Sequence, residues 1–162
     1  MVLVNDLQVD QIAQAIHDSY LAEQSRDGVA MGSTPAMVVW ERLDEDKREA
    51  NRAQARDITD KLRRIGCRVG RGPAVRAFAF TEAELDALAH DEQLRWSSQR
   101  TEAGWRYGSW RDDDVKIHPC LVPGDELPEV EKDKDRDAVR NIPTVLAAAG
   151  LRIVRRRRTE RG

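Results

Sequence analysis

Apolar residues recur at helical spacing near the start of the chain, directly after a polar capping residue. Asn5 stands three positions before Gln8, and Ile12, Ala15 and Ile16 follow on one helical face. In this arrangement each polar side chain hydrogen-bonds a backbone N–H that the first turn leaves without a partner. The pattern therefore predicts an amphipathic helix that begins after Asn5.

A second stretch has the same design. Thr81 precedes Glu84 by three residues, which again is capping-box spacing. Leu85, Leu88 and Leu94 are assigned to the apolar face of the helix that follows. We expect this second helix to begin after Thr81.

Each of these helices is followed by a loop, a short apolar run and a charged helix. The apolar runs, residues 37–40 and 120–122, are typical of short strands. The charged helices are expected to begin near Asp44, which suits an N-cap, and near Pro128, which suits a first helical position because proline lacks the N–H donor. Pro143 should kink or split the second charged helix.

Both charged helices are predicted to end at a glycine. Gly66 and Gly150 are each followed by an apolar residue, as a left-handed C-terminal cap requires. Short strands around residues 68–69 and 152–153 should follow. The run from Gly70 to Pro73 then reads as a joint between two halves.

The two halves are similar enough in sequence to indicate an internal repeat. Residues 43–69 align without a gap on 127–153, at an offset of 84, and residues 12–21 align on 85–94 at an offset of 73. The second copy thus carries 11 extra residues between its two helical parts. The matching pairs are Ile12/Leu85, His17/His90, Asp18/Asp91, Leu21/Leu94, Leu43/Leu127, Arg52/Arg136, Ile58/Ile142, Leu62/Leu146, Gly66/Gly150, Arg68/Arg152 and Val69/Ile153.

These elements predict a mainly α-helical fold with short β strands (α+β). The expected organisation is a degenerate first repeat unit (1–70), a linker (71–80), a second repeat unit (81–154) and a basic C-terminal tail (155–162). Each repeat unit would be marginally stable alone. We therefore expect the two helical units to pack about a pseudo-twofold axis on one core.

Composition narrows the functional classes. With 27 Lys and Arg against 29 Asp and Glu, the net charge of −2 argues against a protein that mainly coats nucleic acid or an acidic membrane. The N-terminus lacks the features of a secretory signal, and no apolar run is long enough to insert into a membrane. Cys67 and Cys120 show no repeated spacing, so two separate thiols in a cytoplasmic protein are expected.

The 11-residue insertion lies in the most unusual segment, residues 99–123. Aromatic and arginine side chains alternate there between Gly104 and Gly108 and shortly beyond, and another tryptophan lies just upstream. The candidate ligand-binding residues are Trp96, Trp105, Arg106, Tyr107, Trp110, Arg111 and His118.

The ordered motifs of this half resemble the ryanodine receptor repeat (Ryr) family. They are GWRYG (104–108), RDD (111–113), HPCLVP (118–123) and ELP (126–128), followed by a charged helix that ends in AAG. The resemblance covers roughly residues 82–154. The first half resembles the family only weakly: it keeps the His-Asp pair of the first helix, residues 40–43 and the Gly66 ending, but has no GWRYG or HPCLV.

The resemblance implies a mostly helical fold of two quasi-symmetric units without catalytic activity. In animal calcium-release channels such repeats occur in pairs on the cytoplasmic face and resemble adenine-nucleotide binding modules. Similar bacterial and phage domains stand alone or are fused to signalling, channel or effector domains, and are thought to sense a nucleotide-derived messenger. A prokaryotic or phage stand-alone member with a role in antiviral defence signalling is the corresponding expectation here.

The residue types of the insertion suit a nucleotide. Trp105 and Tyr107 would stack on a base, and Arg106 and Arg111 would bind phosphate oxygens. The alternatives are that Trp105 and Tyr107 are only core packing, that Trp110 does not contact the ligand, and that the arginines pair with carboxylates of residues 112–114.

Other chemistry has weaker support. His118 suits a bond to the backbone or a turn better than contact with a ligand or a zinc site shared with His90. His17 and His90, at equivalent places, suggest a shared structural bond. Three consecutive Asp residues cannot all face one metal ion, so no metal and no cofactor are expected. Cys120 lies in an apolar run that would raise its pKa, and no nucleophile motif is present.

The sequence thus favours a non-catalytic module that senses or sequesters a nucleotide or nucleotide-derived second messenger of the adenine or ADP-ribose type. An effector or channel protein is a further candidate partner, a homo-oligomer is compatible with the repeat, and no sequence-specific nucleic-acid binding is expected. The alternative is a protein-interaction or assembly domain without a small ligand. The arginines of residues 155–158 read as a solvated tail that could bind phosphate non-specifically.

Overall fold

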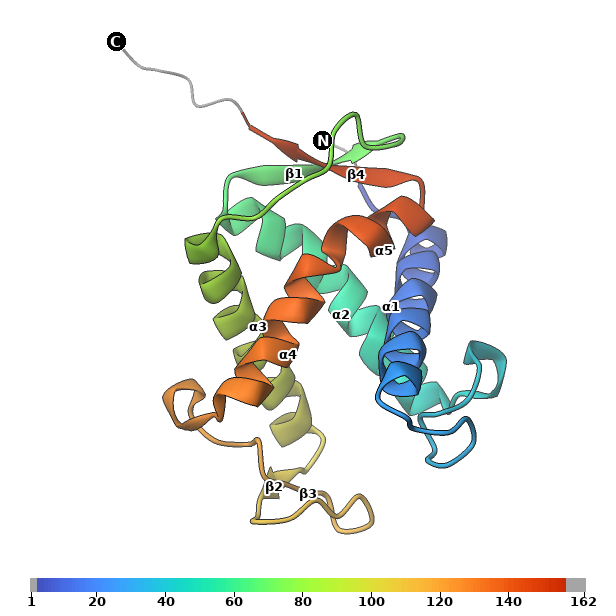
Figure 1. The fold of residues 1–162 in the computed structure, drawn as a ribbon, viewed down its shortest axis with the longest axis vertical. Helices are drawn as coiled ribbons and strands as arrows, with labels where there is room; N and C mark the ends of the chain where they lie inside the picture. The colour runs from blue at the N-terminus through green and yellow to red at the C-terminus, as the bar shows by residue number, and fades with distance from the viewer. Residues whose placement is uncertain (1–2, 157–162) are drawn as a thin grey trace. The chain divides into compact units, whose positions relative to one another are not determined.

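The protein is mainly α-helical with a few short strands, as the sequence predicts (Figure 1). The computed structural model describes residues 3–156. Its elements are α1 (Asp6–Arg26), the 3-10 turn η1 (Trp40–Arg42), α2 (Glu45–Arg64), β1 (Cys67–Arg71), α3 (Glu82–Glu102), β2 (Arg106–Tyr107), β3 (Ile117–His118), η2 (Gly124–Glu126), α4 (Glu129–Arg140), α5 (Ile142–Ala148) and β4 (Leu151–Arg155).

The chain forms two compact units. The first contains the described residues up to Phe78 and those from Ile142 onward, and the second is Ala79–Asn141. The end of the second sequence copy, α5 and β4, thus belongs to the first compact unit. The predicted boundaries at residues 70, 80 and 154 divide the chain into repeat units by sequence similarity, not into compact units. They stay a prediction. Residues 157–162 of the predicted basic tail lie outside the described residues.

In the first unit, α1 packs against α2 and α5, and the ribbon of β1 and β4 lies beside α2 and α5. The interior is built from side chains of all these elements, including Ile12, Leu62, Leu146 and Leu151, which are at most 1% exposed. Burying such aliphatic side chains stabilises the folded state by about 1.5–3 kcal/mol each.

The two strands of the first unit pair antiparallel, with Val69 opposite Ile153 at the centre. These two residues are equivalent in the repeat alignment, so the ribbon joins the two copies at corresponding positions. Gly66 and Gly150 have φ of 71° and 70° directly before the strands. The predicted left-handed C-terminal caps are therefore confirmed.

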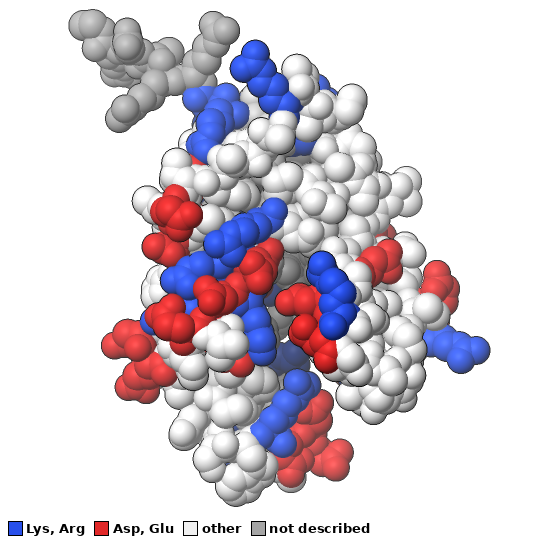
Figure 2. All heavy atoms as spheres, in the orientation of Figure 1, with Lys and Arg blue, Asp and Glu red and all other residues white. Residues whose placement is uncertain are grey.

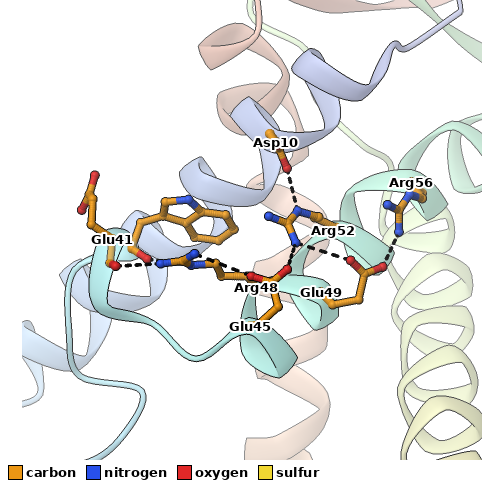
Figure 3. A network of polar contacts seen from close by, with 8 residues as sticks. Asp10, Glu41, Glu45, Arg48, Glu49, Arg52 and Arg56 are labelled. Carbon is orange, nitrogen blue, oxygen red and sulfur yellow. Dashed lines mark hydrogen bonds and ion pairs between the residues drawn. The ribbon is translucent and has the colours of Figure 1, made fainter.

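Charged side chains of the helices are arranged in mixed groups, and Figure 2 shows acidic and basic residues side by side at several places on the visible face. One such group surrounds Arg52 (Figure 3), which binds Asp10 of α1 at 2.6 Å and Glu45 of its own helix at 2.5 Å. Arg56 binds Glu49 at 2.7 Å and lowers the pKa of that carboxyl. This network, the Arg52 network, joins α2 to α1.

In the second unit, α3 packs against α4 and η2. Leu85, Leu88, Leu127 and Val139 are at most 5% exposed. Leu94, which the sequence pattern assigned to the same face, is 52% exposed, so that assignment was wrong. Leu94 lies nine residues after Leu85, and at 100° per residue this spacing places the two side chains on opposite sides of the helix.

The capping boxes of α1 and α3 are both confirmed: Asn5 pairs with Gln8, and Thr81 with Glu84. Asp44 is the N-cap residue of α2 but makes no side-chain capping bond, and Pro128 lies one position earlier than predicted, at the N-cap of α4.

The second charged helix is split, as Pro143 predicts. Helix α4 ends at Arg140 and α5 begins at Ile142, with the break at Asn141. This break coincides with the boundary between the two compact units.

The predicted strands at residues 37–40 and 120–122 are absent: both segments are turns that lead toward the 3-10 helices η1 and η2. Met37 is fully buried without a strand partner, and the Val38 carbonyl accepts a 2.6 Å hydrogen bond from His17 Nε2. Of these apolar positions Met37 is buried, whereas Val39 is 46% exposed, and the His17 side chain provides the hydrogen bond that a neighbouring strand would have provided.

Among the described residues, none of the helices combines the length and apolar character that a membrane crossing needs.

Candidate functional site

The segment between α3 and η2 is a closed loop held by its own backbone. β2 and β3 pair in parallel, Arg106 opposite Ile117 and Tyr107 opposite His118. Lys116 adopts a left-handed φ of 56°, and its Nζ donates a 2.7 Å hydrogen bond to the Ala103 carbonyl at the end of α3. These bonds place His118 beside the last turns of α3.

Four residues form an aromatic–arginine cluster at this place: Trp96, Arg100, Trp105 and His118. The His118 ring meets the Trp96 ring edge-on at 4.8 Å and the Trp105 ring at 6.2 Å. The Arg100 guanidinium lies 5.1 Å from the Trp105 ring centre and 5.9 Å from that of Trp96. Both distances are in the range of cation–π attraction.

Arg100 is partly buried and, among the described residues, pairs with no carboxylate. Among residues 3–156, no carboxylate forms an ion pair with its guanidinium, and its contacts are the two indole rings. Burial lowers the pKa of Arg100, and the positive charge of Arg111 lowers it further, although the charge of Asp113 also acts on Arg100 and raises its pKa. The arginine thus keeps its hydrogen-bond donors available beside two aromatic faces.

His118 is held in its neutral form by its surroundings. Burial lowers the pKa of the imidazole, and the charges of Arg111 and Arg100 lower it further. Its Nδ1 accepts a 3.0 Å hydrogen bond from the backbone N–H of Cys120, so the proton of the neutral ring is on Nε2. The predicted structural bond of His118 to the backbone is confirmed.

Arg111 lies close enough to the cluster to act on both His118 and Arg100, but it is already paired. It binds Asp113 through two hydrogen bonds, at 2.7 and 3.1 Å. This outcome matches the alternative in which loop arginines pair with neighbouring carboxylates. Since both side chains are more than half exposed, the pair contributes little stability and can exchange its partner at small cost.

The remaining predicted residues lie on the outside of the loop. Tyr107 and Trp110 are 59% and 63% exposed, and Arg106 is exposed as well. The alternative in which Tyr107 is a core residue is therefore excluded. The structure brings together Trp96, Trp105 and His118 of the predicted set, with Arg111 nearby.

The other candidate chemistry is accounted for by local bonds. Asp112 accepts hydrogen bonds from the backbone N–H groups of Asp114 and Val115, as in an Asx turn. Within residues 3–156, no three His, Cys, Asp or Glu side chains gather as metal ligands would. Burial raises the pKa of the Cys120 thiol, and the Glu131 carboxylate raises it further.

The sequence predicts an equivalent structural hydrogen bond at His17 and at His90, and this prediction is wrong for His90. His17 is 3% exposed and bonded to Val38, whereas His90 is exposed and lies against Gly124.

Sequence reasoning missed Arg100, which is the centre of the cluster. The available signal was its spacing from Trp96, because residues four apart share a helix face. Trp105 also follows Arg100 closely in the sequence. In the structure the Trp105 N–H donates a hydrogen bond to the Arg100 carbonyl directly after the helix end.

Comparison with known families identifies the segment that contains this loop. Residues 80–155 match the RyR domain family. The match begins just before α3, includes the complete aromatic–arginine cluster and ends with β4. The resemblance carried by GWRYG, HPCLVP and the charged helix is thus confirmed: residues 80–155, just under half of the chain, match the RyR domain family.

Proposed function

We propose that this protein is a non-catalytic module that binds a nucleotide or a nucleotide-derived messenger at the aromatic–arginine cluster. In this role it would sense or sequester the messenger. The observation that carries the proposal is Arg100, a partly buried guanidinium that faces two indole rings and has no carboxylate partner among the described residues.

Arg100 and the two tryptophans offer the two kinds of contact that a nucleotide needs. A base is flat and stacks on aromatic or guanidinium faces, which Trp96, Trp105 and Arg100 present. Phosphate oxygens accept paired hydrogen bonds from arginine. Desolvation of Arg100 makes the arrival of an anion favourable, because an anion compensates the cost of a buried charge.

Arg111 would provide a second anion contact by exchanging Asp113 for phosphate. The present pair is exposed, so a more highly charged partner can replace it. His118, neutral and with its N–H on Nε2, would act as a hydrogen-bond donor to the base or the ribose rather than as a second cation.

The absence of catalysis is part of the proposal. Cys120 is held as a thiol, which is a weak nucleophile, because burial and Glu131 raise its pKa. His118 has one ring nitrogen occupied by the Cys120 amide and therefore cannot act through that nitrogen as a general base.

A protein partner is the second candidate, favoured by the exposed loop residues Tyr107, Trp110 and Val115. They are 59%, 63% and 54% exposed on the same loop. Exposed aromatic residues are characteristic of interaction surfaces. An effector docking on this loop is compatible with a ligand at the cluster.

The direct experiment is a thermal-shift screen with ATP, ADP, AMP, NAD, ADP-ribose, cyclic ADP-ribose isomers and cyclic oligonucleotides. A ligand at 100 times its Kd stabilises the folded protein by about 2.7 kcal/mol, which is a shift of several degrees for a chain of this length. The affinity of each hit is then measured by calorimetry.

Matched variants locate the site. Arg100→Gln and Trp105→Ala should each weaken binding by at least tenfold, whereas Arg48→Gln and Trp40→Ala should leave the affinity unchanged. Arg48 and Trp40 form an equivalent cation–π contact, at 5.7 Å, in the first unit. Equal affinity in all four variants, or no hit at millimolar ligand, would reject the proposal. Conversion of a bound nucleotide during overnight incubation would reject its non-catalytic part.

A further inference from the structure

The ribbon of β1 and β4 carries arginines that are not paired like those of the helices. Arg68, Arg71 and Arg152 lie on the ribbon and form no ion pair among residues 3–156, although Arg152 donates to the Pro73 carbonyl at 3.2 Å. By contrast, Arg52 and Arg136 of the helices each bind several carboxylates.

The strand register fixes where these arginines stand. Cys67, Val69 and Leu151 are buried, so they occupy the inner face of the ribbon. Arg68 and Gly70 alternate with them and share the outer face with Val154 and Arg152, their partners across the ribbon.

The outer face is flat enough at Gly70 for the Arg152 side chain to cross it. A Cβ at Gly70 would stand 3.4 Å from Arg152 Nε and 2.8 Å from Val154 Cγ2. Arg71 and Arg155 stand at opposite ends of the ribbon, where Arg155 lies 4.8 Å from the Phe78 ring centre. By the same alternation Arg71 and Arg155, opposite Leu151 and Cys67, belong to the inner-face register at the two ends, so the arginines of the outer face are Arg68 and Arg152.

No acidic residue belongs to the segments that form this surface. Residues 61–81 and 138–156 contain ten Lys and Arg and no Asp or Glu. Although the net charge of the whole chain is close to zero, these two segments are therefore strongly basic. In Figure 2, basic side chains near the end formed by β1 and β4 have few acidic neighbours.

We propose that the outer face of the β1–β4 ribbon, with Arg68 and Arg152 at its centre, binds the phosphate backbone of nucleic acid without reading its sequence. Both cations of the outer face, Arg68 and Arg152, are arginines, whose planar guanidinium binds two phosphate oxygens at once. An anionic membrane fits less well, because a membrane-surface element needs an exposed apolar face and the inner face of this ribbon is buried.

The test is fluorescence anisotropy of the full chain with a labelled 20-base-pair DNA duplex, at 50 to 200 mM salt. Non-specific binding of this kind has a Kd of about 10⁻⁴ to 10⁻⁶ M and weakens steeply with salt. Arg68→Gln/Arg152→Gln should lower the affinity roughly tenfold at 50 mM salt and reduce the slope of log affinity against log salt by about 2.

The matched control is Arg56→Gln/Arg140→Gln, which removes the same charge from arginines that are paired with Glu49 and Asp137. It should bind DNA like the unmodified chain. Equal losses in both double variants, or no binding at 50 mM salt with 100 μM protein, would overturn the proposal. So would binding to vesicles of phosphatidylserine and phosphatidylcholine in the absence of DNA binding. Circular dichroism melting of both variants verifies that they fold.

Discussion

Arg52 and Arg136 make the same connection in the two halves of the chain. Arg52 Nε binds Asp10 on α1 at 2.6 Å, and Arg136 Nε binds Asp86 on α3 at 3.0 Å. The two arginines are equivalent in the repeat alignment, and carboxylate hydrogen bonds raise the pKa of both. In each half, one arginine of the charged helix therefore ties that helix to the first.

Replacement of Arg52 should destabilise the first unit measurably. Arg52→Gln leaves Asp10 and Glu45 without their shared cation, and we expect a loss of about 1 kcal/mol, or a Tm lower by about 2–4 °C. The loss should shrink in 0.5 M NaCl because salt screens the network. Arg63→Gln is the control, since Arg63 is half exposed and, among residues 3–156, binds only Asp60. A salt-independent loss would show that the network is not electrostatic in origin.

Truncation of the equivalent core leucines tests the packing. Leu62 and Leu146 are both fully buried, so Leu62→Ala and Leu146→Ala should each lower the free energy of unfolding by about 2–5 kcal/mol. Leu94→Ala, at a site 52% exposed, should change it by less than about 0.5 kcal/mol. Denaturant titration followed by circular dichroism measures all three. A large effect at Leu94 would restore its assignment to the apolar face.

Features determined by neighbouring residues could be predicted from the sequence. The capping boxes at Asn5 and Thr81, the glycine caps at Gly66 and Gly150, and the break near Pro143 all depend on bonds within one helical turn. Each of these was predicted at or within two residues of its position.

Features that depend on distant contacts could not be predicted in the same way. Cys120 to Val122 has the composition of a strand, but Gln93 on α3 donates a 3.0 Å hydrogen bond to the Cys120 carbonyl, and the segment forms a turn. The candidate residues Trp105 and His118 were found by their type and motif. Their meeting with Arg100 depends on how the loop folds back onto α3, which spacing alone does not give.

The low pKa of His118 should make stability depend on pH. Burial and the charges of Arg111 and Arg100 lower the folded-state pKa below the ordinary value of 6.5. The unfolded chain then binds more protons between these two pKa values, so the contribution of His118 to stability is complete above pH 6.5 and is lost as the pH falls below it.

The comparison with His118→Asn isolates this effect, since an asparagine oxygen can still accept the Cys120 amide hydrogen bond. The Tm of the unmodified chain, relative to that of the variant, should fall as the pH decreases from 7 to 5. Proton NMR of the His118 ring gives the pKa directly. A titration midpoint at or above 6.5 would contradict the electrostatic description of the cluster.

Gly108 should be the most sensitive position of the loop. A Cβ at residue 108 would stand 2.1 Å from Ile117 Cγ2, so Gly108→Ala must push β3 away from its present place. Because His118 is the next residue on that strand, the His118 contacts with Trp96 and Trp105 should be lost. We expect a changed tryptophan fluorescence spectrum and, if the cluster binds a nucleotide, a loss of affinity of at least tenfold.

The cause of this effect can be separated from general disruption by a second substitution. Ile117→Ala removes the atom that the new methyl group meets, so the double variant Gly108→Ala/Ile117→Ala should recover the fluorescence of the Ile117→Ala single variant. Ser109→Ala, at the adjacent exposed position, should have no effect. If the double variant were as perturbed as Gly108→Ala alone, the close approach of Gly108 to Ile117 would not be what positions His118.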